Sequence, residues 1–244
     1  MAGEPLLAAV GVRKQYGALA ALDGVDLEIG PGDAIGIVGP NGAGKTTLLN
    51  VLAGTTVPSG GSVTFRATDV TRSGAARRAR LGIGRAHQIP RPFGGMTVFE
   101  NCLVGASTGG GLRGRAAYAC CLDVLERCNL ADVADRRADT LGLLQRKRLE
   151  LARALATNPV LLLLDEIGAG LTDAEAAELV TLINSLHGDQ GIAIVWIEHI
   201  VHVLVQVVTR LICMDAGRVI ADGEPAGVMR DARVVDAYLG TAAA

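Results

Sequence analysis

The fold of this chain is decided by one stretch, Gly39-Pro40-Asn41-Gly42-Ala43-Gly44-Lys45-Thr46-Thr47. It matches the pattern G-x-x-x-x-G-K-[ST], whose glycines let the backbone wrap a phosphate group with its N–H groups. The apolar run 34–38 precedes this stretch, and a helix-prone run, 45–53, follows it. A strand, a glycine-rich loop and a helix in that order begin an α/β core. We therefore predict a phosphate-binding loop at the N-terminus of a helix, whose dipole favours an anion.

Two side chains of this loop predict its chemistry. Lys45 would contact the β- and γ-phosphates of a nucleotide, and the Thr46 hydroxyl would ligate Mg²⁺. The alternative is a glycine-rich turn with an incidental lysine. The complete pattern, placed between a predicted strand and a predicted helix, argues against that alternative.

A second apolar run, 161–164, ends in two acids, Asp165 and Glu166. A run without alternation fits a strand of a parallel sheet that is covered on both faces. The acids then lie at the carboxyl edge of the sheet, where ligands of open α/β folds bind. We predict that Asp165 holds the Mg²⁺ shell and that Glu166 polarises the attacking water. A solvated acidic strand end is the alternative, which the phosphate loop upstream disfavours.

Composition sets further limits. The chain has 244 residues, half of them apolar and a fifth charged, which fits one large or two small compact domains. Its net charge of −2 and its scattered basic residues provide no footprint for nucleic acid. The five cysteines lack CxxC spacing, so we expect reduced cytosolic thiols rather than a zinc site or a disulfide framework.

Neither the start of the chain nor the apolar segment 192–208 is interpreted as a targeting or membrane sequence. The start of the chain has no basic region followed by an apolar stretch, so no signal peptide is expected. The apolar segment 192–208 is interrupted by Glu198, His199, His202 and Gln206. We interpret it as a buried strand running into a helix, not as a membrane span.

With these motifs in place, the chain resembles the ATP-binding subunits of ABC transporters over nearly its whole length. The resemblance implies an α/β fold of the phosphate-loop NTPase class in its ABC ATPase form. This form has a mostly parallel core sheet, an antiparallel β lead-in and an inserted helical subdomain. We expect a single ABC ATPase domain over 1–244, with 1–67 and 159–244 in the α/β core and 68–158 in the helical subdomain.

The resemblance also implies roles for three more residues. Tyr16 would stack on adenine, although a half-buried packing tyrosine remains an alternative. Gln88 would sense Mg²⁺ and the attacking water, and His199 would hydrogen-bond the γ-phosphate; a metal site with His202 is the competing interpretation. The expected catalytic residues are Lys45, Glu166 and His199. The expected Mg²⁺ ligands are Thr46, Gln88 and Asp165. The expected ATP ligands are Tyr16, Gly39, Pro40, Asn41, Gly42, Ala43, Gly44, Lys45, Thr46, Thr47 and Gln88.

The chain departs from the family at its signature, which is usually close to LSGGQ and caps the ATP held by the opposite subunit. The aligned residues are Leu141-Gly142-Leu143-Leu144-Gln145. Gly142 replaces a serine hydroxyl, and Leu144 stands where a glycine lets the backbone come close. The segment 167–172 likewise lacks a proline and an aspartate common in the family. We therefore expect asymmetry, in which this chain's own site works only with an intact signature from a different subunit.

Four stretches resemble the ATPases of branched-chain amino acid importers: 96–101, 148–156, 217–223 and 235–240. This resemblance implies a second ABC ATPase subunit, two integral-membrane permease subunits and an external solute-binding protein. It places the chain in the cytoplasm, on the inner face of the cell membrane, coupling ATP hydrolysis to uptake of branched-chain amino acids or a similar small solute. The loop 89–96 would receive the permease, with an ordinary turn as the alternative.

Two other functions remain open. A soluble ABC ATPase of DNA repair or translation uses the same motifs, but such proteins usually carry coiled-coil insertions or tandem modules, which this chain lacks. A nucleotide-binding regulatory half with weak hydrolysis would explain the altered signature. Glu166 and His199 argue against that second possibility. A homodimer in place of the heterodimer is also possible.

Overall fold

The computed structural model describes residues 4–240. Residues 1–3 and 241–244, the two ends of the expected single domain, lie outside the described residues. The chain forms two compact units: the first contains residues up to 75 and from 193 onward, and the second contains residues 76–192. The core and subdomain limits expected from the sequence stay predictions.

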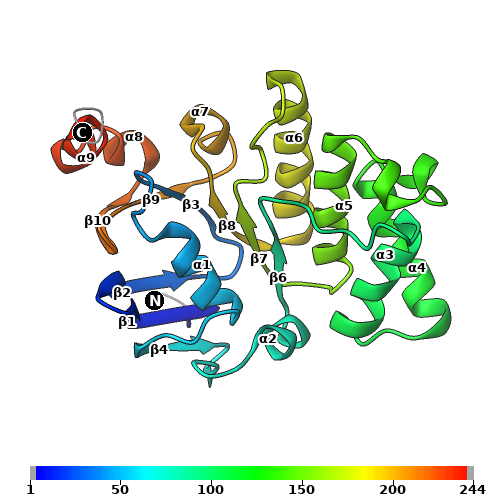
Figure 1. Cartoon of the computed structure of the whole chain (residues 1–244), viewed down its shortest axis with the longest axis horizontal. Coiled ribbons are helices and arrows are strands. Elements are labelled where there is room, and N and C mark those ends of the chain that lie inside the picture. The colour runs from blue at the N-terminus through cyan, green and yellow to red at the C-terminus, as the bar shows by residue number, and fades with distance from the viewer. Residues whose placement is uncertain (1–3, 241–244) are drawn as a thin grey trace. The chain divides into compact units, whose positions relative to one another are not determined.

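The first unit begins with an antiparallel sheet whose strand order is β2-β1-β4-β5 (Figure 1, blue to cyan). Along β2, Val25, Leu27 and Ile29 are buried while the residues between them are exposed, which is the alternation of a sheet with one covered face. This sheet is the predicted β lead-in. Its strands are β1 (Leu7–Tyr16), β2 (Leu19–Ile29), β4 (Gly60–Phe65) and β5 (Thr68–Asp69).

The same unit contains a group of mostly parallel strands in the order β10-β9-β3-β8. β3 is buried along its whole length and pairs in parallel with both β8 and β9. Gly36 in β3 has no room for a side chain, because a Cβ there would lie 2.7 Å from Leu204. The strands are β3 (Ala34–Val38), β8 (Ala193–Ile197), β9 (Arg210–Asp215) and β10 (Arg218–Gly223); the helices are α1 (Lys45–Ala53), α7 (Val201–Leu204), α8 (Pro225–Val228) and α9 (Ala232–Gly240).

The second unit contains a parallel strand pair and most of the long helices. β6 pairs with β7 in a register that sets Arg85 opposite Leu163. Helices α3, α4 and α5 gather together (Figure 1, green) and contact one another. The strands are β6 (Ile83–Ala86) and β7 (Leu161–Asp165); the helices are α2 (Ala75–Leu81), α3 (Val98–Val104), α4 (Gly114–Arg127), α5 (Leu143–Leu155) and α6 (Asp173–Gln190), with a π-helical turn (Gly105–Gly109) and two 3₁₀ turns (Ala131–Val133 and Ala138–Thr140).

All five cysteines are free thiols, and four of them are buried. Burial raises the pKa of Cys128 from 9.0 to about 12, and burial together with nearby Asp215 raises the pKa of Cys213 to about 11. A thiol with such a pKa stays protonated at neutral pH and is a poor nucleophile. These cysteines therefore act as small core residues.

The segment 192–208 folds as β8 followed by α7, as the sequence predicts. Within residues 4–240, no helix has the length and apolar character needed to cross a membrane.

Candidate active site

The phosphate-loop stretch lies between β3 and α1 in the first unit, as predicted. Gly39, Gly42 and Gly44 have φ angles of 144°, 82° and 98°, a region that L side chains rarely adopt. At Gly39 a Cβ would lie 2.1 Å from the carbonyl oxygen of Met214, and at Gly44 it would lie 2.4 Å from that of Ala21. Two of the glycines are therefore required both by their backbone angle and by close packing.

The N-terminus of α1 is suited to an anion. Gly44 is its N-cap and contributes no side-chain hydrogen bond, and the first turn contains no acidic residue. The first N–H groups of a helix carry partial positive charge and favour a phosphate. This end of the helix therefore fits the phosphate that the sequence predicts.

Lys45 is folded back over the loop. Its Nζ donates to the carbonyl oxygens of Gly39, at 2.6 Å, and Pro40, at 2.9 Å. Lysine is almost never this buried unless its charge is partnered. The loop carbonyls thus hold the ammonium group beside the backbone that would wrap the phosphates.

Sequence reasoning missed a contact to the same loop. The backbone N–H of Gly39 donates to the Tyr238 hydroxyl at 2.9 Å. Burial raises the pKa of Tyr238, so the phenol stays neutral and accepts this hydrogen bond. Tyr238 lies on α9, 199 residues away in sequence, and no local pattern connects the two positions.

Tyr16 and His199 also belong to the first unit. Tyr16 ends β1 with 48% of its surface exposed, and the Lys14 Nζ lies 5.0 Å from the ring centroid. An exposed ring can stack on a base, and the predicted role of Tyr16 stays a prediction. His199 is exposed and lies two residues after the end of β8.

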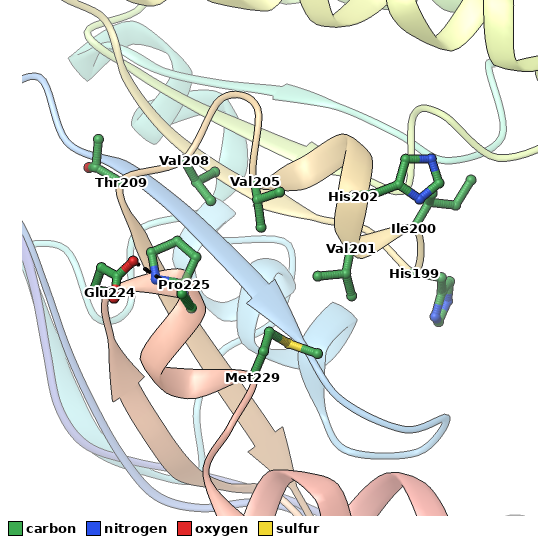
Figure 2. A pocket seen from close by; sticks show the side chains of 11 residues that line it. His199, Ile200, Val201, His202, Val205, Val208, Thr209, Glu224, Pro225 and Met229 are labelled. Atoms are coloured by element: carbon green, nitrogen blue, oxygen red, sulfur yellow. Dashed lines mark hydrogen bonds between the residues drawn. The ribbon is translucent and has the colours of Figure 1, made fainter.

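His199 and His202 line one end of a largely apolar hollow of about 1110 Å³, and Thr209 and Glu224 lie at its other end (Figure 2). Between these ends the lining is formed by apolar side chains such as Val205. Among the described residues, no group of three or more histidine, cysteine or acidic side chains is placed to hold a metal ion. The hollow therefore gives no support to a metal site at these two histidines.

The second unit holds the predicted acids at the end of β7. Asp165 is only 4% exposed and forms an ion pair with Arg85 of β6, with 2.9 Å between Nη2 and Oδ2. The parallel register of β6 and β7 places both side chains near the same strand end. Arg85 is a second residue that the sequence analysis missed.

Glu166 follows Asp165 in a strained backbone conformation. Its φ of 45° lies in the left-handed region. This conformation costs a non-glycine residue about 1 to 3 kcal/mol, and residues that adopt it cluster at functional sites. Gln88 Nε2 donates to Glu166 Oε2 at 2.5 Å. Two residues predicted to act on the same water therefore lie in direct contact.

Lys147 and His87 lie close to this pair. Lys147 Nζ donates to the backbone carbonyl oxygen of Gln88 at 2.9 Å and to that of Glu166 at 3.4 Å. Burial, and secondarily the charge of Arg85, lowers the pKa of His87, so its imidazole is neutral at neutral pH. The predicted residues thus form two groups: Gln88, Asp165 and Glu166 in the second unit, and the phosphate loop, Tyr16 and His199 in the first.

The altered signature forms the start of α5. Gly142 is the N-cap, and a Cβ built there would meet nothing within 4 Å, so a serine would fit. The N-cap provides no side-chain hydrogen bond, and the first turn has no acidic residue. The backbone N–H groups of this end remain suited to an anion, while the hydroxyl is missing.

Comparison with known proteins identifies the family. A family model described as ABC transporter matches residues 22–169, more than half of the chain. The chain belongs to the ABC transporter family. A second model, of the branched-chain amino acid ATP-binding cassette transporter, matches residues 218–244 of this ABC transporter ATPase.

Curated relatives cover nearly the whole ABC ATPase. The high-affinity branched-chain amino acid transport ATP-binding protein LivG of Salmonella typhimurium is 37% identical, over 98% of this chain and 99% of the relative. The protein BraF of Pseudomonas aeruginosa, with the same description, is 33% identical over the same shares of both chains.

Solved structures give the same result. A nucleotide-free ATP-binding cassette from an ABC transporter has a TM-score of 0.88 at 31% identity, over 96% of this chain and 99% of that one. A cassette in its ADP conformation has a TM-score of 0.89 at 32% identity, over 98% and 100%. The predicted α/β ABC ATPase fold is confirmed.

Proposed function

We propose that this ABC ATPase binds ATP with Mg²⁺ and hydrolyses it to drive uptake of branched-chain amino acids or a similar small solute. The observation that carries the proposal is the contact of the Gln88 amide with the carboxylate of Glu166, beside the buried Asp165. A general base must be oriented toward its water before its pKa matters. The names of the LivG and BraF relatives support the solute class.

In the proposed reaction, the Glu166 carboxylate accepts a proton from a water molecule while the water oxygen forms a bond to the γ-phosphorus. The bond between that phosphorus and the bridging oxygen breaks, which leaves ADP and inorganic phosphate. Gln88 uses its Nε2 to hold the carboxylate, so its amide oxygen is left for the water or the metal. Lys45 and the N–H groups of the loop bind the phosphates, and His199 donates to the γ-phosphate.

The chain offers oxygen donors of the kind that Mg²⁺ prefers: the hydroxyl of Thr46, the carboxylate of Asp165 and the amide oxygen of Gln88. When bound, Mg²⁺ would neutralise charge on the β- and γ-phosphates. The ion pair with Arg85 holds the Asp165 carboxylate in place at the end of β7.

The proposed partners are a second ABC ATPase subunit, two membrane permeases and an external solute-binding protein. The altered signature supports a heterodimer, because Gly142 contributes no hydroxyl to a partner's phosphate. A complex of this kind holds the chain on the cytoplasmic face of the cell membrane.

A small apolar surface supports the permease contact. Phe93 and Met96 are 45% and 39% exposed, and the Arg153 guanidinium lies 4.9 Å from the Phe93 ring centroid. Asn101 accepts from the Phe93 N–H at 2.8 Å and donates to its carbonyl at 3.1 Å. These two hydrogen bonds fix the backbone at Phe93.

The test is ATP turnover by this chain with its co-expressed permeases and second ATPase, reconstituted in lipid with a panel of amino acids. We expect turnover that rises with one branched-chain solute and falls at least about 100-fold in Glu166→Gln, because the base is lost. Full turnover by the isolated chain, unaffected by solute, would instead favour a soluble ATPase.

The altered signature favours one second candidate, a nucleotide-binding regulatory half. In that case Glu166→Gln in this chain leaves the turnover of the complex unchanged, while the same change in the partner abolishes it.

A further inference from the structure

Helix α5 is attached to the loop after β6 at two separate points. Lys147 Nζ donates to the Gln88 carbonyl at 2.9 Å, and Arg153 donates to the Arg91 carbonyl at 2.8 Å. Glu150 adds a longer contact, accepting from the Arg91 N–H at 3.4 Å. The helix that begins with the signature and the loop that contains Gln88 are therefore held together along three residues of the helix.

Lys147 alone among these three also reaches the end of β7. Its Nζ donates to the Glu166 carbonyl oxygen at 3.4 Å, while the residue is only 3% exposed. An ammonium group has three donors and can serve several acceptors in different directions. One buried cation thus bridges the backbones of Gln88 and Glu166, whose side chains are themselves hydrogen-bonded.

The direction of the Glu166 carboxylate depends on the backbone conformation of Glu166. Its φ of 45° is a strained value that persists only because surrounding contacts hold it. The Ala169 N–H donates to the Glu166 carbonyl at 3.1 Å from one side, and Lys147 donates to it from α5. Removal of the Lys147 ammonium group would take away the second of these two hydrogen bonds and leave the first, from the Ala169 N–H. The backbone at Glu166 would then be less constrained.

We propose that Lys147 is a positioning residue that sets the orientation of the Glu166 carboxylate and of Gln88 according to the position of the signature helix. This inference rests on the proposed role of Glu166 as general base. A displacement of α5 moves the ammonium group, and the ammonium group moves both backbones. Lys147 touches neither nucleotide nor water in this scheme.

The test uses Lys147→Met, which keeps the length of the side chain and removes its donors, in the full chain co-purified with its partners. We expect kcat for ATP to fall about 10- to 100-fold, the effect of a small misplacement of a catalytic group. ATP affinity, measured with a fluorescent ATP analogue, should change less than about threefold, since no ground-state contact is lost. Lys147→Arg, which keeps a cation and several donors, should recover part of kcat.

Arg148→Met is the matched control. Arg148 is the next residue of α5, is also buried, and pairs with Glu178 of α6 instead of the active site. We expect its turnover to stay within about threefold of the unchanged chain, because its loss costs stability rather than orientation. Equal losses in Arg148→Met and Lys147→Met would show a general effect of removing a buried cation from α5 and would overturn the inference.

The role of Lys147 and the proposed role of Glu166 as general base can fail independently in these experiments. Turnover of Lys147→Met within twofold of the unchanged chain, while Glu166→Gln is inactive, overturns the role of Lys147 and leaves the ATPase proposal intact. A fall in ATP affinity as large as the fall in kcat also overturns it. Unchanged turnover in Glu166→Gln overturns the proposed base itself.

Discussion

The Gln88 amide and the Glu166 carboxylate, 78 residues apart in sequence, meet in a hydrogen bond of 2.5 Å. Gln88 follows β6 and Glu166 follows β7, and these two strands pair in parallel. Parallel pairing brings the carboxyl ends of both strands to one edge, so the contact is a direct result of the strand order. One side chain is thereby held by the other at the place where the proposed reaction needs a fixed base.

Replacement of Gln88 by alanine removes the donor that holds the Glu166 carboxylate. We expect kcat for ATP to fall about 10- to 100-fold with a smaller change in KM, because orientation is lost rather than ground-state binding. Steady-state turnover of the reconstituted complex measures both constants. Gln88→Glu keeps the shape but sets two carboxylates together, so it should be at least as inactive; turnover near normal in Gln88→Glu would contradict the assignment.

Removal of Arg85 should destabilise the protein by about 3 to 5 kcal/mol, the usual result of removing one partner of a buried ion pair. The partner is Asp165, and both side chains of the pair are less than 10% exposed. Urea unfolding of Arg85→Met measures the loss. Adding Asp165→Asn to that variant should restore most of the stability without restoring turnover. If the double variant is no more stable than Arg85→Met, the ion pair is not the cause.

Two glycines of the phosphate loop give a matched comparison. Gly39→Ala must displace the Met214 carbonyl, whereas a Cβ at Gly42 meets nothing within 4 Å. Gly42→Ala should therefore lower the free energy of unfolding by only about 1 to 2 kcal/mol, the cost of a left-handed backbone in a residue with a side chain. Gly39→Ala should lower it by more and abolish ATP binding. Thermal unfolding and binding of a fluorescent ATP analogue test both variants. Equal effects would mean that backbone angle alone, and not packing, decides the loop.

The signature can be repaired by Gly142→Ser together with Leu144→Gly, because the space at Gly142 is open. We expect the repaired chain to raise turnover at the partner's site about 10-fold or more, consistent with a hydrogen bond to a charged phosphate worth about 1.5 to 3 kcal/mol. The measurement is turnover of a complex in which this chain also carries Glu166→Gln, so only the partner's site works. No gain in that complex would show that the signature is not limiting.

The buried thiols predict a loss of stability in alkali. The folded pKa values of Cys128 and Cys213, about 12 and about 11, lie above the ordinary value of 9.0. The unfolded chain therefore releases these protons first, and stability falls as the pH rises above 9 toward 11. Urea unfolding at several pH values measures the slope. Cys128→Ala with Cys213→Ala should flatten it, and an unchanged slope would assign the effect to other groups.

Local patterns in the sequence were enough to predict the strands β3, β7 and β8, the loop around Lys45 and the position of the two acids at the end of β7, whereas β6 lies inside the segment 68–158 that was expected to be a helical subdomain. Each of these depends on residues that are neighbours along the chain. The partners of those residues could not be predicted in the same way: Arg85 pairs with Asp165 across 80 residues, and Lys147 reaches the Gln88 carbonyl across 59. The left-handed backbone of Glu166 has no sequence signal either, since glutamate is not a residue that favours it.

The hydrogen bond from Gly39 to Tyr238 joins the most general part of this protein to its most specialised part. Gly39 begins a loop shared by a very wide class of nucleotide-binding proteins, whereas Tyr238 lies in the segment matched by the branched-chain amino acid transporter model. Exchange of the segment 218–244 between subfamilies would thus change the hydrogen bonding of the phosphate loop. A change at Tyr238 would therefore remove a hydrogen bond from the loop without changing any residue of the loop.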